Sequence, residues 1–306
     1  MVRVAVMGQA AFGKAVLDRL RSDGVTVSVV SAPGPSGKKV DPLWEEGERS
    51  GLPLVPTTEL KTAEGLQQWK DAGIDLCVMA FVTVYLPHEV FTVPSLGTVQ
   101  FHPSLLPLHR GPSAMNWAVI NGETETGLCV FWPDEGLDTG PVLLEKRCEI
   151  QPDDTLGSLY FDRLFPMGVD ALSESVALVA EGNAPRAEQD HAVSTYEPLC
   201  DDRHAQIHWH EPARRVYDLI RGCDPQPGAW TRFEDESLHL YGCQLAGEQR
   251  PGMPGEVLGI DGDGFTVRLN GDVLQVGKVR AGDARKTGAA EWAVQVGLQV
   301  GHRFRT

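Results

Sequence analysis

Short apolar runs alternate along the first half of the chain with longer segments of helical periodicity. Val2–Gly8 is an apolar run ending in glycine, which is typical of a buried parallel strand that turns into a helix, here residues 12–24. The same order of strand and helix repeats through residues 25–82, and another strand begins at Gly97. This alternation predicts an α/β fold with a Rossmann-like, doubly wound and mainly parallel sheet.

The pattern changes in the second half. Residues 125–150 read as strand segments around a Gly and Asp turn, a helical segment follows within 154–182, and Pro185–Asp202 is polar and irregular, as in a linker. Beyond it, β-branched runs separated by Gly and Asp turns over 255–280 predict a small, OB-like β-barrel. We therefore expect two domains, a larger one at 1–203 and a barrel-like one at 204–306.

Composition and charge narrow the possible functions. The 306 residues are 42% hydrophobic and 23% charged, as in globular proteins, and the net charge of -15 disfavours a broad grip on nucleic acid. The six cysteines include no CxxC pair, and the chain has neither a signal-peptide pattern nor an apolar stretch of about 18 residues. These features predict a cytoplasmic protein that does not enter a membrane.

Two sequence motifs partly resemble ligand-binding sites, but each lacks residues that such a site requires. The segment GQAAFGKA, residues 8–15, has Ala15 where a phosphate-binding loop needs Ser or Thr, and Ala10 where a dinucleotide fingerprint needs glycine. His204, His208 and His210 cluster in sequence, but no carboxylate or cysteine pattern completes a metal site. We expect a plain strand-to-helix turn at the first motif and no metal at the second.

His102 is the main candidate for a catalytic residue. It follows a predicted buried strand and precedes a loop bounded by prolines, so its ring is expected at the end of the sheet. The turn DEGLDTG, residues 134–140, offers a carboxylate at Asp138. Two bland alternatives stay open at this point: a buried histidine satisfied by a backbone carbonyl, and an aspartate that only caps its own turn.

The motifs around these residues resemble those of a known family. HPSLLPLHRG followed by GLDTG is similar to the 10-formyltetrahydrofolate-dependent formyltransferases, which include methionyl-tRNA formyltransferases. AVMGQAAFG, VFWPDEGLDTG, LFPMG and IRGCDPQPGAW more closely resemble the amino-terminal hydrolase domain of 10-formyltetrahydrofolate dehydrogenases. The resemblance implies the formyltransferase fold, a folate-dependent enzyme of one-carbon metabolism, and 10-formyltetrahydrofolate as formyl donor without a metal. Because the sequence stops at Thr306, we expect no oxidation of the formyl group.

The family's catalytic residues map onto this sequence with one departure. The resemblance implies that His102 and Asp138 are catalytic, and it places Gln100 where many members have asparagine. Gln100 lies two residues before His102, so on a strand it shares that residue's face. A glutamine amide can donate to a developing oxyanion, although Gln100 could instead merely pack or bind water.

Folate-binding residues are implied by the resemblance alone. They lie in the loop after the fourth strand and in the loop that bears Asp138, and they are Phe81, Val82, Thr83, Tyr85, Asp134, Glu135, Gly136 and Leu137. Arg110 is a weaker candidate for meeting a folate carboxylate, since an arginine in a Gly and Pro loop is more often solvated or pinning its own loop.

The acceptor of the formyl group stays open. An amine on a small molecule or a carrier-bound group and water both remain. The resemblance slightly favours an amine, because Gln100 stands where the hydrolase domain of the dehydrogenases typically has an aliphatic residue. Transfer to tRNA ranks third, because residues 206–306 carry 12 Lys and Arg against 13 Asp and Glu. A non-enzymatic folate-binding protein is a further alternative, which the joint presence of His102 and Asp138 disfavours.

Overall fold

The computed structural model describes residues 2–37 and 39–305, which form two compact units. The first unit takes in three segments of the chain: residues up to Gly111, Gly127–Cys148 and Phe161–Tyr196. The second takes in the remainder: Pro112–Thr126, Glu149–Tyr160 and the residues from Glu197 onward. The expected division of the chain near residue 204 stays a prediction.

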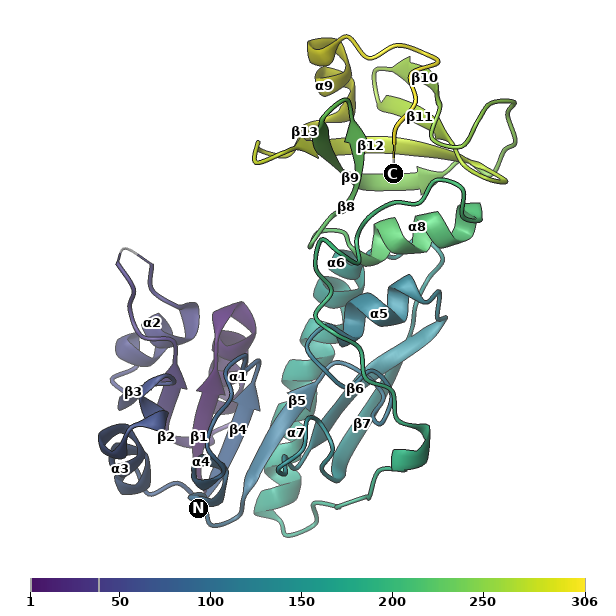
Figure 1. Cartoon of the computed structure of the whole chain (residues 1–306). Helices are drawn as coiled ribbons and strands as arrows, with labels where there is room; N and C mark the ends of the chain where they lie inside the picture. Colours follow the sequence, from purple (N-terminus) through teal and green to yellow (C-terminus); the bar gives the residue numbers. More distant parts are fainter. Residues whose placement is uncertain (1, 38, 306) are drawn as a thin grey trace. The chain divides into compact units, whose positions relative to one another are not determined.

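The first unit is built on a seven-stranded sheet in the order β3-β2-β1-β4-β5-β6-β7 (Figure 1). The strands β3, β2, β1, β4 and β5 pair in parallel, whereas β6 runs antiparallel to β5. The predicted mainly parallel α/β sheet is therefore confirmed. The strand bounds are β1 Arg3–Gly8, β2 Thr26–Ala32, β3 Leu54–Pro56, β4 Leu76–Ala80, β5 Thr98–His102, β6 Glu125–Phe131 and β7 Val142–Glu149.

Helices cover both faces of this sheet, as in a doubly wound fold. Consecutive residues Val6 and Met7 of β1 point to opposite faces, and both are fully buried. Val6 lies in one apolar cluster with Phe12 of α1, and Met7 lies in another with Trp69 of α3. The helices that follow these strands are α1 Ala10–Ser22, α2 Pro42–Arg49, η1 Glu59–Lys61, α3 Ala63–Asp71, α4 His88–Thr92, η2 Tyr160–Leu164, α7 Phe165–Ala180 and η3 His191–Val193.

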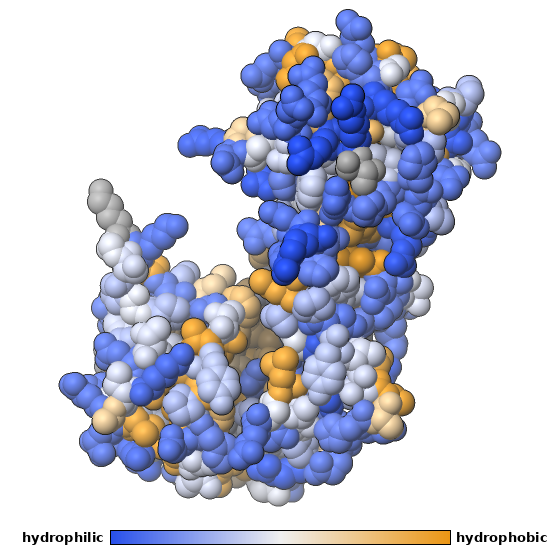
Figure 2. All heavy atoms as spheres, in the orientation of Figure 1, coloured by the Kyte–Doolittle hydropathy of each residue, from blue (hydrophilic) through white to orange (hydrophobic). Residues whose placement is uncertain are grey.

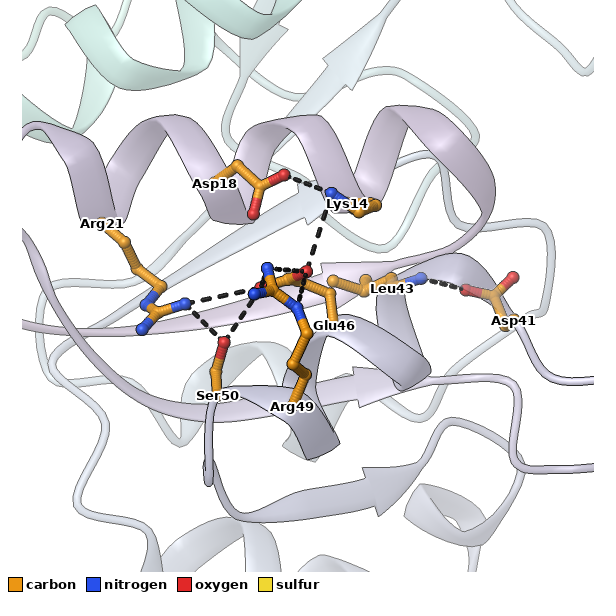
Figure 3. Close-up of polar contacts among 8 residues, drawn as sticks. All are labelled: Lys14, Asp18, Arg21, Asp41, Leu43, Glu46, Arg49 and Ser50. Atoms are coloured by element: carbon orange, nitrogen blue, oxygen red, sulfur yellow. Dashed lines mark hydrogen bonds and ion pairs between the residues drawn. The ribbon is translucent and has the colours of Figure 1, made fainter.

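A buried carboxylate connects α1 to α2. Glu46 of α2 is 2% exposed and accepts hydrogen bonds from Arg49 and Ser50, and it lies 3.6 Å from the Lys14 ammonium of α1 (Figure 3). Arg21 of α1 reaches the same carboxylate. The Arg49 guanidinium holds the pKa of the Glu46 carboxyl below its ordinary value. The carboxylate is therefore charged and acts as a shared acceptor between the two helices.

Substituting Glu46→Gln is expected to lower the free energy of unfolding by about 1–3 kcal/mol, because the charge-assisted hydrogen bonds from Arg49 within α2 and from Arg21 of α1 are weakened and the ion pair with Lys14 of α1 is lost. Since the folded pKa is depressed, this contribution is complete above the ordinary carboxyl pKa and fades as the pH falls through the lowered value. Denaturant unfolding at neutral and acidic pH measures both effects. The exposed Glu45→Gln on the same helix is the control, and equal stabilities of the two variants at neutral pH would refute the prediction.

The second unit holds an antiparallel sheet in the order β10-β11-β12-β9-β8, with β13 paired to β12 (Figure 1). The C-terminal segment joins both edges of this sheet, because Arg305 bridges Arg232 of β8 and Arg303 bridges Glu256 beside β10. These two bridges close the sheet into a small barrel, as the sequence pattern predicted. Its strands are β8 Ala229–Phe233, β9 Glu236–Leu245, β10 Val257–Asp261, β11 Gly264–Arg268, β12 Val273–Ala281 and β13 Thr287–Gly288.

Among the described residues of the second unit, four helices accompany this sheet. They are α5 Ala114–Ile120, α6 Leu156–Leu159, α8 Ala213–Gly222 and α9 Ala289–Val296. The Asn116 amide of α5 donates to the carbonyl of Gly222 at the end of α8, at 2.9 Å, which ties these two helices together. Among residues 2–37 and 39–305, no helix has the length and apolar character that crossing a bilayer requires.

Candidate active site

His102 occupies the last position of β5 and is 5% exposed. It pairs across the sheet with Cys129 of β6, and its ring meets that of Phe131 edge-on with 6.5 Å between the centroids. Because β1, β4 and β5 run parallel, their carboxyl ends lie at one edge of the sheet. The histidine thus stands at the expected edge.

The hydrogen bonds of the His102 ring determine which nitrogen carries its proton. Nε2 lies 2.9 Å from the carbonyl oxygen of His109, and because a carbonyl only accepts, Nε2 must be the N–H donor. Nδ1 lies 3.6 Å from Oδ2 of Asp138. A proton that this imidazole takes from a ligand or gives to it is therefore exchanged at Nδ1, on the side of the carboxylate.

Asp138 reaches His102 by a route that the sequence pattern did not indicate. Strand β6 ends with Phe131 opposite Gln100, so the turn after β6 does not leave from the carboxyl end of β5. The β6–β7 turn instead folds back, with Asp138 in the left-handed region at φ 55°. The Gly111 amide donates to Asp138 Oδ2 at 2.9 Å, and the side chain is 7% exposed. The two side chains therefore converge in one buried place.

Arg110 belongs to the interior of the first unit, since it is 1% exposed. Its guanidinium donates twice to Oε1 of Gln189, at 3.2 and 2.6 Å, and once to the Tyr196 hydroxyl at 2.5 Å. It also lies 3.0 Å from Nδ1 of His191. Of the alternatives expected for Arg110, this arrangement matches an arginine that pins its own loop, here to residues 189–196.

Gln189 is a site residue that the sequence pattern did not reveal. Its amide nitrogen donates to the carbonyl oxygens of Asp138 and Gly140, at 3.0 and 2.6 Å. Thr195 contributes further contacts, because its hydroxyl accepts from the His109 amide and its carbonyl from the Arg110 amide. The expected linker at 185–202 thus includes residues that are part of the site's framework. Its polar composition gave no signal of this role.

Gln100 is partly buried near the middle of β5, between Met79 of β4 and Phe131 of β6. Strand alternation places its side chain on the same face as His102. Its role as an oxyanion donor stays a prediction.

The residues expected to bind folate lie in two surface loops. Phe81 and Tyr85 follow β4 and are 46% and 84% exposed, and Leu137 in the turn after β6 is 58% exposed. Figure 2 shows hydrophobic residues reaching the surface of the first unit among hydrophilic ones. The Thr83 hydroxyl accepts a hydrogen bond from the side-chain amide of Gln9, in the turn after β1, at 3.1 Å. Val82 is partly buried.

The second loop is organised by its own side chains. Asp134, Glu135 and Gly136 are exposed, and the Asp134 carboxylate accepts from the Gly136 amide at 2.9 Å and from the Thr139 hydroxyl. The Asp134 side chain therefore shapes its loop. Binding of folate by these residues stays a prediction.

In the segment that partly resembles a phosphate-binding loop, residues 8–15, a protein carboxylate already binds the backbone amide at the start of the helix. Ala10 adopts φ 57°, and its amide at the start of α1 donates to a carboxylate oxygen of Asp41 at 2.8 Å. A phosphate at this helix end would meet that negative charge. The added Cβ of any residue in place of Gly8 would lie 2.0 Å from the Ala80 carbonyl, so this glycine serves the close approach of β1 to β4.

The three clustered histidines of the second unit have separate environments. His204 lies 3.0 Å from an Asp201 carboxylate oxygen, His208 is exposed, and His210 lies 3.4 Å from the Arg303 guanidinium. Over the residues that the structure describes, no group of three or more His, Cys, Asp or Glu side chains is arranged to hold a metal ion. His210 and Arg303 line a pocket of about 630 Å³ in the second unit, which contains none of the predicted site residues.

Comparison with known proteins gives two family matches in order along the chain. Residues 2–176, more than half of the chain, match the family described as "Formyl transferase". Residues 201–296 match "Formyl transferase, C-terminal domain".

Among curated proteins, the chain is 40% identical to a cytosolic 10-formyltetrahydrofolate dehydrogenase of Xenopus laevis, over 84% of this chain and 29% of that protein. The chain thus spans less than a third of the length of this relative. It is also 29% identical to a methionyl-tRNA formyltransferase of Geobacter metallireducens, over 98% of both proteins.

Solved structures agree on the fold. HypX from Aquifex aeolicus in complex with tetrahydrofolic acid matches with a TM-score of 0.70 at 18% identity, over 100% of this chain and 50% of HypX. An N-formyltransferase from Helicobacter canadensis matches with a TM-score of 0.66 at 15% identity, over 94% of this chain and 100% of that one. The sheet and barrel described above are therefore those of the predicted formyltransferase fold. On the family matches, this chain belongs to the formyl transferase family of enzymes.

Proposed function

We propose that the protein transfers the formyl group of 10-formyltetrahydrofolate to an amine of a small-molecule or carrier-bound acceptor. The observation that carries this proposal is the buried pair of His102 and Asp138, 3.6 Å apart, in a chain of the formyl transferase family. A formyl group on N10 of folate is already activated. The reaction therefore needs proton transfer and stabilisation of a tetrahedral intermediate more than it needs a covalent nucleophile.

The proposed steps follow from the state of His102. The acceptor nitrogen attacks the formyl carbon, and negative charge develops on the formyl oxygen as the new C–N bond forms. Nδ1 of His102 takes the proton from the attacking group, and Asp138 stabilises the imidazolium that results. The oxyanion then re-forms the carbonyl as the bond to N10 breaks, and N10 takes the proton back from Nδ1 of His102, which yields tetrahydrofolate and the formylated amine. Nε2 stays bonded to the His109 carbonyl throughout and keeps the ring oriented.

Gln100 is proposed to donate its amide hydrogen to the formyl oxygen. Replacing Gln100→Leu is then expected to lower kcat by at least about 10-fold, because losing one oxyanion donor typically costs about 3 kcal/mol or somewhat less. Steady-state kinetics with 10-formyltetrahydrofolate measures the change. Unaltered kinetics would remove Gln100 from the mechanism.

The loops after β4 and β6 are proposed to bind the folate. Exposed Phe81, Tyr85 and Leu137 offer apolar surface to a pterin and its arylamine. The two-domain division near residue 204 and a cytoplasmic location remain part of the proposal. Of the partners considered, the balanced charge of residues 206–306 favours a small acceptor over tRNA.

Hydrolysis is the second candidate, since the curated relative at 40% identity is a 10-formyltetrahydrofolate dehydrogenase. Water would then take the place of the amine, and the products would be tetrahydrofolate and formate. The same His102 Nδ1 would accept a proton from the attacking water. Transfer is preferred over hydrolysis because Gln100 stands where the hydrolase domain of the dehydrogenases typically has an aliphatic residue.

Incubating the protein with 10-formyltetrahydrofolate labelled in the formyl carbon, with and without candidate amines, tests the proposal. Mass spectrometry follows the label. Label on an amine supports transfer, and label in formate regardless of the amine supports hydrolysis. Label that stays on the folate under all conditions would refute both candidate functions.

A further inference from the structure

The tripeptide His109–Gly111 contacts both His102 and Asp138 through its backbone. The His109 carbonyl accepts from Nε2 of His102, and the Gly111 amide donates to the Asp138 carboxylate. His109 and Gly111 both have positive φ, 54° and 113°, which turns their backbone groups in the directions that these bonds require. One short segment therefore places the imidazole and one oxygen of the carboxylate.

The side chain between them reaches the main chain of Asp138 indirectly. Arg110 donates from two nitrogens to Oε1 of Gln189, so that oxygen is fixed as an acceptor. The Gln189 amide nitrogen must then face away, toward the carbonyls of Asp138 and Gly140, to which it donates. Gln189 is 7% exposed and Arg110 is 1% exposed, so water competes little with these bonds.

We infer that Arg110 and Gln189 are positioning residues that hold Asp138 in the left-handed conformation in which its carboxylate faces His102. This inference rests on the proposed function, because positioning matters to the rate only if the pair is catalytic. Neither residue touches the reacting atoms. Arg110 orients the amide of Gln189, and the amide clamps the carbonyls on both sides of the turn that carries Asp138.

The substitution Gln189→Glu separates positioning from folding. A glutamate keeps an acceptor oxygen at the position of Oε1 and forms an ion pair with Arg110, so the buried guanidinium keeps its partner. It has no N–H to donate, and it turns a carboxylate oxygen toward two carbonyls. We expect kcat to fall about 10- to 100-fold, because a displacement on the order of 1 Å at a reacting group costs that much. The KM for 10-formyltetrahydrofolate is expected to stay within about threefold, and the melting temperature is expected to fall while the variant stays folded, because two buried carbonyls lose their donor.

A second readout does not depend on activity. The Gly111 amide hydrogen is bonded to Asp138 in the wild type, so its exchange with deuterium, followed by NMR, reports whether Asp138 has moved. Exchange at Gly111 is expected to accelerate in Gln189→Glu. The matched control is Gln244→Glu, the same change at an exposed position of β9, which should alter neither kcat nor exchange at Gly111.

The outcomes are distinct. Normal kcat together with unchanged protection of the Gly111 amide in a folded Gln189→Glu variant would overturn the inference. A wild type that never releases the formyl group would overturn the proposed function, while exchange at Gly111 would still report on positioning. Should Gln189→Glu fail to fold, Gln189→Asn, which keeps an amide one methylene shorter, is expected to give the same fall in kcat with KM preserved, and unchanged kcat there would equally overturn the inference.

Discussion

The variant His102→Ala is expected to lose about 100- to 10,000-fold in kcat for formyl release, the usual contribution of a positioned general acid or base. Alanine removes the only group that we propose to take the proton of the attacking acceptor. It also leaves the His109 carbonyl without the Nε2–H donor, so a small loss of stability is expected as well. Steady-state formation of tetrahydrofolate, with unfolding followed in parallel, measures the two effects separately.

Exposed His208→Ala in the second unit is the matched control and should retain full activity. A His102→Ala variant that releases formyl at the wild-type rate would show that the protein is not an enzyme of the proposed kind. The folate-binding alternative without catalysis would then gain support.

The variant Asp138→Asn is expected to lower kcat by a similar factor, about 100- to 10,000-fold, with little change in stability. Asparagine has nearly the same shape, and its amide oxygen can still accept from the Gly111 amide. That position, Oδ2 in the wild type, is also the one that lies 3.6 Å from Nδ1 of His102, so the nitrogen that must take up a proton would meet a neutral oxygen in place of a negative charge. The rate of formyl release, with the melting temperature as a check on folding, tests this expectation.

Exposed Asp235→Asn in the β8–β9 turn provides the same chemical change away from the site and should be silent. If Asp138→Asn proved as active as that control, Asp138 would be a turn residue only. That outcome would return Asp138 to the bland alternative of a local cap.

The sheet of the first unit was predictable because its strands are buried on both faces. The run Val4–Gly8 is apolar throughout, and the structure buries all of its residues. The position of His102 at the end of a strand followed from the same pattern. The barrel was also predictable from β-branched runs between Gly and Asp turns, although the C-terminal segment that closes it carries no such pattern.

The framework of the site was not predictable from local pattern. Arg110 and Gln189 are 79 positions apart, and a buried contact between distant polar residues leaves no periodicity in either segment. For Arg110 the pattern left both solvation and pinning of its own loop open, and it named no partner. A glutamine in a polar stretch such as that of Gln189 reads as a surface residue, and tertiary hydrogen bonding overrides that expectation here.

The expected approach of Asp138 to His102 rested on one rule, which explains the place of the histidine but not that of the aspartate. The carboxyl-end rule for parallel strands accounts for His102. It does not account for Asp138, because β6 is antiparallel to β5 and the turn after it must fold back. Asp138 adopts a φ of 55° within that turn, a backbone conformation that the sequence pattern around it did not indicate.

The central claim is that His102 and Asp138 act as one unit on the formyl group, and a double-mutant cycle tests it most directly. The rate of formyl release from 10-formyltetrahydrofolate is measured in the wild type, in His102→Ala, in Asp138→Asn and in the variant with both changes. Residues that act as a unit are strongly non-additive, so we predict that the double variant is about as slow as the slower single variant. Losses that multiply in the double variant would contradict the account, since they would show that the two side chains act independently.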